Sequence, residues 1–244
     1  MSDPIEGVAE LPPPPVFIAA DRAAGFTMKL PRAGITLLPP WWIFLLWSDK
    51  RHENRAPSVA GRIQGWRGLF AFGASKVTGA DKQEEIVMEA RSVIGEPWFG
   101  WNANKPKPFP AKEMFARGGH IVGVSELLGT EPNGEDPKDK WAVPGEHSLL
   151  LGRVWEVEPV PCSGGRGMCA IGACKHCHHI GSIENKADPL VCRRCKKTTL
   201  RQELEHPSLR ILAEYGRNGH PQPISLTETF IEAPHPSTTP SPET

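Results

Sequence analysis

The order of hydrophobic and polar positions predicts several short strands and few helices. Apolar residues fill segments 35–38 and 68–74, and they alternate with polar or small residues along 120–128 and 147–157. Short apolar runs and period-two alternation are both typical of β-strands. The pattern indicates a mainly β protein of the α+β class, and we expect these strands to close into a barrel because closure removes exposed strand edges.

Helical signals occur in three other segments. Segment Trp41–Trp47 is aromatic and follows Pro39-Pro40, so we predict a short helix there. Segment 81–94 is the clearest helix, because its apolar residues recur at helical spacing. We also predict a short helix over Ser208–Tyr215, and a long irregular loop over 96–117, which is rich in proline, lysine and aromatic residues.

The distribution of proline marks the two ends of the chain. Of the 26 prolines, eight lie within residues 1–40 and six within residues 221–244. We therefore predict a disordered Pro-rich leader at 1–33, a barrel domain at 34–171, a zinc-ribbon module at 172–201, a short helical segment at 202–220 and a disordered tail at 221–244.

Charge and hydropathy narrow the possible compartments and partners. The formal net charge is zero, which argues against a protein that coats nucleic acid by charge alone. The first residues are acidic and precede no long apolar run, and the longest apolar run, Trp41–Trp47, is far too short to cross a membrane. We expect a soluble intracellular protein, cytoplasmic, with no membrane partner.

Two Cys-x-x-Cys pairs provide the strongest local signal. They are Cys174 with Cys177 and Cys192 with Cys195. In a reducing compartment this spacing favours a tetrahedral site for one structural Zn²⁺ over disulfides, and four protein ligands leave no open position for catalysis. Two alternatives stay open: a redox pair, and replacement of one cysteine ligand by a nearby histidine. The histidines are His176, His178 and His179.

The predicted ribbon is modestly basic. Segment 172–201 contains seven lysines and arginines against two acidic residues. Four thiolates and one Zn²⁺ together carry two negative charges, so a positive excess remains. Arg193 and Arg194 are candidate phosphate contacts, although the cations can equally serve to offset the thiolate charge.

A charged cluster follows the aromatic helix directly. If Glu53 begins a strand, alternation sends Glu53 and Arg55 to one face, next to Lys50. A solvated helix end is the simpler interpretation of such a charge run.

Segment 48–55 reads Ser-Asp-Lys-Arg-His-Glu-Asn-Arg and resembles the Gly-x-Lys-x-x-Glu-x-Arg hallmark of the ASCH (activating signal cointegrator homology) domain, with Ser48 in place of glycine. Further segments similar to that family are Pro40-Trp41, Ser75-Lys76 at a strand end, Ile121-Val122-Gly123 and Pro161-Cys162. They occur in the family's order across residues 34–171, so the chain resembles the ASCH branch of the PUA-like β-barrels.

The resemblance implies a module that binds nucleic acid or reads a modified base. We expect RNA rather than plain duplex DNA as the partner, because aromatic side chains stack on unpaired bases while lysine and arginine hold phosphate. The predicted nucleic-acid-binding residues are Trp41, Lys50, Glu53, Arg55, Lys76, Arg193 and Arg194.

Two other functions remain open. Some small ASCH-like proteins are amidohydrolases on N4-acylated cytidine, which would make Lys50 and Glu53 candidate catalytic residues for acid-base chemistry. Glu53 stands where those enzymes have a threonine, however, and this departure argues against hydrolysis. A coregulator-type protein-interaction module, with the ribbon or the tails in contact with a partner, is the third possibility.

Overall fold

The structure is a computed structural model that describes part of the chain. The described residues are 26–60, 63, 65, 67–94, 109–135, 137–163, 168–183, 190–192, 194–200, 203–216 and 221–222. Strands predominate, and the mainly β, α+β class predicted from the sequence is confirmed. Among the described residues, the helices are all too short or too polar to span a membrane.

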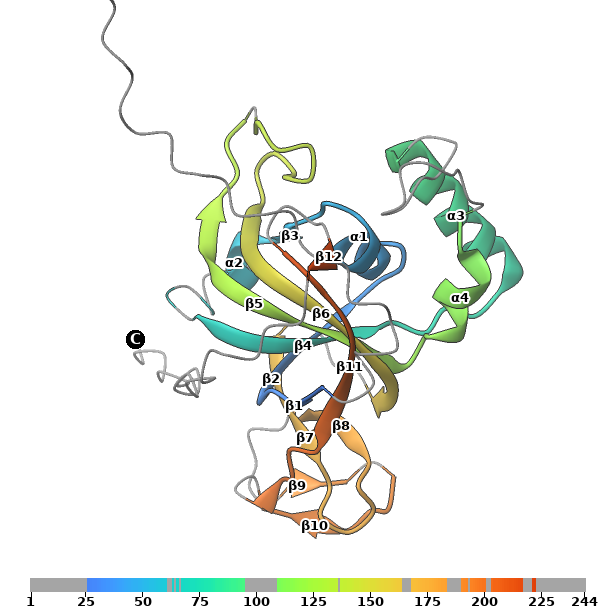
Figure 1. Cartoon of the computed structure of the whole chain (residues 1–244), viewed down its shortest axis with the longest axis vertical. Helices are drawn as coiled ribbons and strands as arrows, with labels where there is room; N and C mark the ends of the chain where they lie inside the picture. The colour runs from blue at the N-terminus through green and yellow to red at the C-terminus, as the bar shows by residue number, and fades with distance from the viewer. Residues whose placement is uncertain are drawn as a thin grey trace, which may run out of the picture.

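Six strands form a closed ring (Figure 1). Around the ring they pair in the order β6, β5, β4, β2, β7 and β8, and β8 pairs again with β6. Their bounds are β2 Ala33–Leu37, β4 Gly68–Ala74, β5 His120–Pro132, β6 His147–Ser163, β7 Met168–Ala173 and β8 Ile180–Ile183. The four strands predicted from the hydrophobic pattern thus belong to one sheet, as expected.

Strand β6 is the longest element, with 17 residues, and it organises the sheet. One edge of β6 pairs with β5 along nearly its whole length. The other edge pairs in turn with β3 (His52–Arg55), β11 (Ser208–Tyr215) and β8. Strands β1 (Thr27–Lys29) and β12 (Pro221–Gln222) pair with β11, while β9 (Leu190–Val191) and β10 (Thr198–Thr199) form a separate hairpin.

Helix α1 (Trp41–Trp47) supplies much of the main core. Its residues from Trp42 to Leu46 are all completely buried, together with Phe70 and Phe72 of β4. Helix α2 (Pro57–Ala60) follows β3, and α3 (Ala80–Ile94) confirms the helix predicted over 81–94. A second apolar cluster on the opposite face of the strands includes Trp155 and packs against β1 and β11.

The predicted helix over Ser208–Tyr215 is wrong, because this segment is strand β11. Leu209 and Ile211 are buried while Ser208 and Arg210 are exposed, which is the alternation of a strand. An irregularity between Ile211 and Ala213 interrupts the period-two pattern. Packing against β6 and β1 therefore overrides the helical propensity of leucine, alanine and glutamate.

Four predicted segments also need correction. The leader assigned to 1–33 contains β1, whose Met28 is buried opposite Leu209 of β11. The loop assigned to 96–117 contains helix α4 (Ala111–Ala116), which buries Met114 in the main core; residues 95–108 lie outside the described part. The ribbon assigned to 172–201 contains β8, a ring strand, and the tail assigned to 221–244 begins with β12. Residues 1–25 and 223–244, where disorder was predicted, lie outside the described part.

Candidate functional site

The four cysteines of the two Cys-x-x-Cys pairs lie together, beside the β9–β10 hairpin at the lower end of the molecule in Figure 1. Their sulfur atoms all lie within 4.8 Å of one another. Cys174 Sγ is 3.8 Å from Cys195 Sγ, and Cys177 Sγ is 3.6 Å from Cys192 Sγ. Tetrahedral ligands at about 2.3 Å from one ion are about 3.8 Å apart, whereas disulfide sulfurs are about 2.05 Å apart. The cluster therefore suits a single metal ion.

Each pair sits in the same kind of turn, which we call a knuckle. In the inner knuckle (residues 174–179), Cys174 N–H donates to His179 O and His178 N–H donates to Cys174 O. In the outer knuckle (residues 192–197), Cys192 N–H donates to Lys197 O and Lys196 N–H donates to Cys192 O. His178 and Lys196 both have a positive φ, 54° and 60°, which reverses the chain after each pair. The two turns therefore present their thiols in equivalent ways.

The inner knuckle favours the thiolate form of Cys174. Burial raises the pKa of this thiol, but hydrogen bonds from His176 N–H, 3.5 Å from the sulfur, and from the Thr199 hydroxyl, 3.6 Å away, help to bring the pKa down to about 6. Thiolates are the form of cysteine that binds a metal, and such donors fix the orientation of the ligand.

The histidines near the first pair contact protein groups. His176 Nε2 is 3.1 Å from Thr198 O, His178 Nδ1 is 2.7 Å from Glu205 Oε2, and His179 Nε2 is 2.5 Å from Ser163 Oγ. Among the described residues, the group able to hold a metal consists of the four cysteines alone. The donor set is therefore four sulfurs, and replacement of a cysteine by histidine is not supported.

The second predicted group is brought together but buried. Lys50 Nζ lies 3.4 Å from Glu53 Oε2, and the other carboxylate oxygen of Glu53 lies 2.9 Å from Arg55 Nη2. Lys50 Nζ also donates to His52 O. Only 1% of Lys50 is exposed, and burial lowers the pKa of its amine despite the attraction of Glu53. In this conformation the Lys50 amine is not accessible to a phosphate.

Trp41 connects this buried group to the surface. The Lys50 amine lies 5.8 Å from the centroid of the Trp41 ring, which is partly exposed. Trp41 N–H donates to the carbonyl of Leu38, whose side chain is 61% exposed. Parallel strands β2 and β4 end side by side here, and Ser75 N–H donates to Leu37 O. Leu38, Trp41 and the exposed Lys76 therefore leave the sheet at the same end, and we call these three residues the Trp41 surface.

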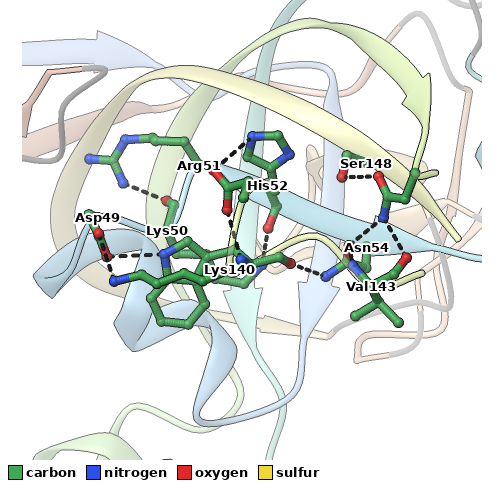
Figure 2. Close-up of polar contacts among 11 residues, drawn as sticks. Asp49, Lys50, Arg51, His52, Asn54, Lys140, Val143 and Ser148 are labelled. Atoms are coloured by element: carbon green, nitrogen blue, oxygen red, sulfur yellow. Dashed lines mark hydrogen bonds and ion pairs between the residues drawn. The ribbon is translucent and has the colours of Figure 1, made fainter. Parts of the chain in front are cut away.

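A polar network fastens β3 to the segment between β5 and β6, as Figure 2 shows. The side-chain oxygen Oδ1 of Asn54 accepts hydrogen bonds from Val143 N–H and from Asn133 Nδ2. Asn133 Oδ1 in turn accepts a hydrogen bond from the Ser148 hydroxyl. Next to it, Asp49 pairs with Lys140 at 2.9 Å and accepts a bond from the Trp141 indole. These contacts hold the chain around Lys50 in place.

Sequence reasoning missed two further buried groups. Glu156 of β6 accepts bonds from Arg117 at 2.7 Å, Tyr215 at 3.0 Å and Trp47 at 3.1 Å, which joins β6 to α4, β11 and α1. The buried guanidinium of Arg51 donates to the carbonyls of Leu45, Ser48, Lys50 and Gly216. For Glu156 the available signal is a charged residue inside an apolar strand, but its partners are distant in sequence. Arg51 lies within a charged run, which gives no sign of burial.

The fold and the cysteine site define a mainly β protein that can hold one metal ion. Comparison with protein families finds no family model that matches the chain, and no curated protein matches it either. The ASCH resemblance therefore stays a prediction. Arg193, a predicted phosphate contact, lies outside the described residues, whereas Arg194 is exposed on the outer knuckle.

Proposed function

We propose that this protein is a nucleic-acid-binding module of the ASCH type, with RNA as the preferred partner and a structural Zn²⁺ in the four-cysteine site. Lys50, Glu53 and Arg55 match the hallmark of that family, and Glu53 pairs with both of the others. Four thiolates in a tetrahedral arrangement are a donor set typical of structural zinc.

The observation that carries the binding proposal is the composition of the Trp41 surface. It combines a partly exposed indole, an exposed leucine and an exposed lysine at one end of the sheet. An indole stacks on an unpaired base regardless of sequence, and a lysine at the same end of the sheet attracts the phosphate backbone. Unpaired bases are available in single-stranded or structured RNA and absent from regular duplex DNA, which favours RNA.

Lys50 has an indirect role in this proposal. Because its amine lies beneath Trp41 and contacts Glu53, it supports the indole instead of touching phosphate. Lys76, by contrast, is exposed and has no acidic partner among the described residues.

The test is to measure RNA binding by the full chain with Trp41→Leu and with Lys76→Gln. Both variants should weaken binding to single-stranded RNA, by about tenfold for Trp41→Leu if one stacked base is lost. Lys29→Gln removes an exposed lysine from β1 and is the matched control. Equal affinity for all four proteins would contradict the proposed surface.

One observation favours hydrolysis as a second candidate function. A lysine whose pKa is lowered by burial, in contact with a carboxylate, can act as a general base. Because the Lys50 amine is buried, this function requires a second conformation in which a substrate reaches it. Incubation with N4-acetylcytidine tests this function, and turnover that disappears in Lys50→Met would establish it.

A further inference from the structure

The outer knuckle carries an exposed cluster of cations. Arg194, Lys196 and Lys197 are all exposed, and the chain has no acidic residue between positions 190 and 200. Figure 1 places this hairpin at the extreme lower end of the molecule, far from α3 and α4. The cluster is therefore a surface of its own, separate from both helices.

The inner knuckle uses the equivalent positions differently. Matching the two turns by their hydrogen bonds aligns the three cations with the three histidines of the inner knuckle. Each of those histidines contacts the rest of the protein, through Thr198, Glu205 and Ser163 respectively, and Lys175 pairs with Glu203 at 2.6 Å. The inner knuckle is thus docked onto its own chain. Within the described residues, Arg194, Lys196 and Lys197 have no acidic partner.

The cations of the outer knuckle carry more positive charge than is needed to offset the negative charge of the metal site. Four thiolates and a divalent ion carry two negative charges, which both knuckles share. Three exposed cations on one turn leave a local positive charge even after that offset. An unpaired cluster of this kind attracts an anion through solvent-exposed contacts.

We propose that the outer knuckle binds the phosphate backbone of single-stranded RNA, as a contact distinct from the Trp41 surface. The proposal rests on the proposed function for the identity of the polyanion. A cluster of cations can bind a phosphate backbone through electrostatic attraction alone. An acidic protein partner would need an apolar patch to bury. Among the side chains of this hairpin whose burial the structure describes, Val191 is the single large apolar one that is exposed.

The experiment compares the salt dependence of RNA binding between the zinc-loaded full chain and the triple variant Arg194→Gln, Lys196→Gln, Lys197→Gln. Each phosphate contact to a single strand contributes about 0.7 to the slope of log affinity against log salt, so the triple variant should reduce the slope by about 2. The control removes the same charge from α3 and α4, with Lys82→Gln, Arg91→Gln and Lys112→Gln, and should keep the wild-type slope. Zinc content, measured in parallel, should be equal in all three proteins.

Each other outcome overturns the proposal in a distinguishable way. A wild-type slope in the triple variant, with Trp41→Leu still weakening RNA binding, would contradict the outer knuckle contact and leave the proposed function intact. No RNA binding by the wild type at low salt would contradict both. If the triple variant loses binding to poly-glutamate but keeps its RNA slope, the partner is an acidic protein.

Discussion

Lys50 is a buried amine held between the carboxylate of Glu53 and the ring of Trp41. Strand alternation correctly placed Glu53 and Arg55 on one face, because residues two apart on a strand share a face. Lys50 precedes β3, and its amine reaches Glu53 from outside the strand. Burial of Lys50 could not be inferred, since it depends on Trp41 and on the distant segment around Trp141 that covers β3. A charge run of this kind is solvated in most proteins, and tertiary structure decides the exception.

Because the Lys50 amine is buried, the free energy of unfolding depends on pH in the alkaline range. Burial lowers the pKa of Lys50 in the folded protein below its ordinary value of 10.5. Between the lowered pKa of the folded protein and the ordinary pKa of the unfolded chain, the unfolded chain binds more protons than the folded chain. The free energy of unfolding therefore rises as pH increases through this range. Lys50→Met should lack this rise, while Glu53 keeps its contact with Arg55.

Denaturant unfolding of the wild type and Lys50→Met, at neutral pH and at about pH 10, measures the difference. Lys29→Met, which replaces an exposed lysine, should keep the wild-type pH dependence. Identical pH dependence in the wild type and Lys50→Met would contradict the burial of the amine.

At the scale of elements, the predictable strands are those with an uninterrupted pattern. Strand β4 and helix α3 were confirmed because their apolar periodicities are continuous. Strand β11 was missed because an irregularity after Ile211 breaks its alternation, and β8 was assigned to the ribbon because it follows the first cysteine pair directly. The cysteine spacing correctly predicted the cluster, but not that the inner knuckle is the turn between two ring strands, β7 and β8.

This placement predicts how metal removal affects the fold. The protein should contain about one equivalent of zinc, and Cys192→Ser should lose most of it. Chelation should increase amide hydrogen exchange strongly in β9 and β10, whose hairpin has little core of its own, and moderately in β8, since β7 and β6 still pair with β8.

Strands β4 and β5 serve as the internal control, because their side chains belong to the two apolar clusters and neither strand carries one of the four clustered cysteines. Unchanged exchange in β9 and β10 after chelation, or a zinc content near zero in the untreated protein, would refute the structural role of the metal.

At the scale of the whole molecule, neutrality limits how the protein can bind a polyanion. The formal net charge of zero provides little long-range attraction, so affinity must come from local groups: the Trp41 surface at one end of the sheet and the outer knuckle beyond the ring. The amino-acid composition alone predicted that binding must depend on local groups, because it fixes the net charge. Sequence could not predict that the two surfaces are separate, because that separation follows from the pairing of β2 with β4 and from the position of the β9–β10 hairpin.

The most direct measurement is equilibrium binding of the zinc-loaded full chain to single-stranded RNA and to duplex DNA across a range of salt concentrations. We expect tighter binding to RNA, with a shallow salt slope that corresponds to about four phosphate contacts, one at Lys76 and three at the outer knuckle. Undetectable binding to both nucleic acids at low salt would contradict the account, and so would preference for duplex DNA.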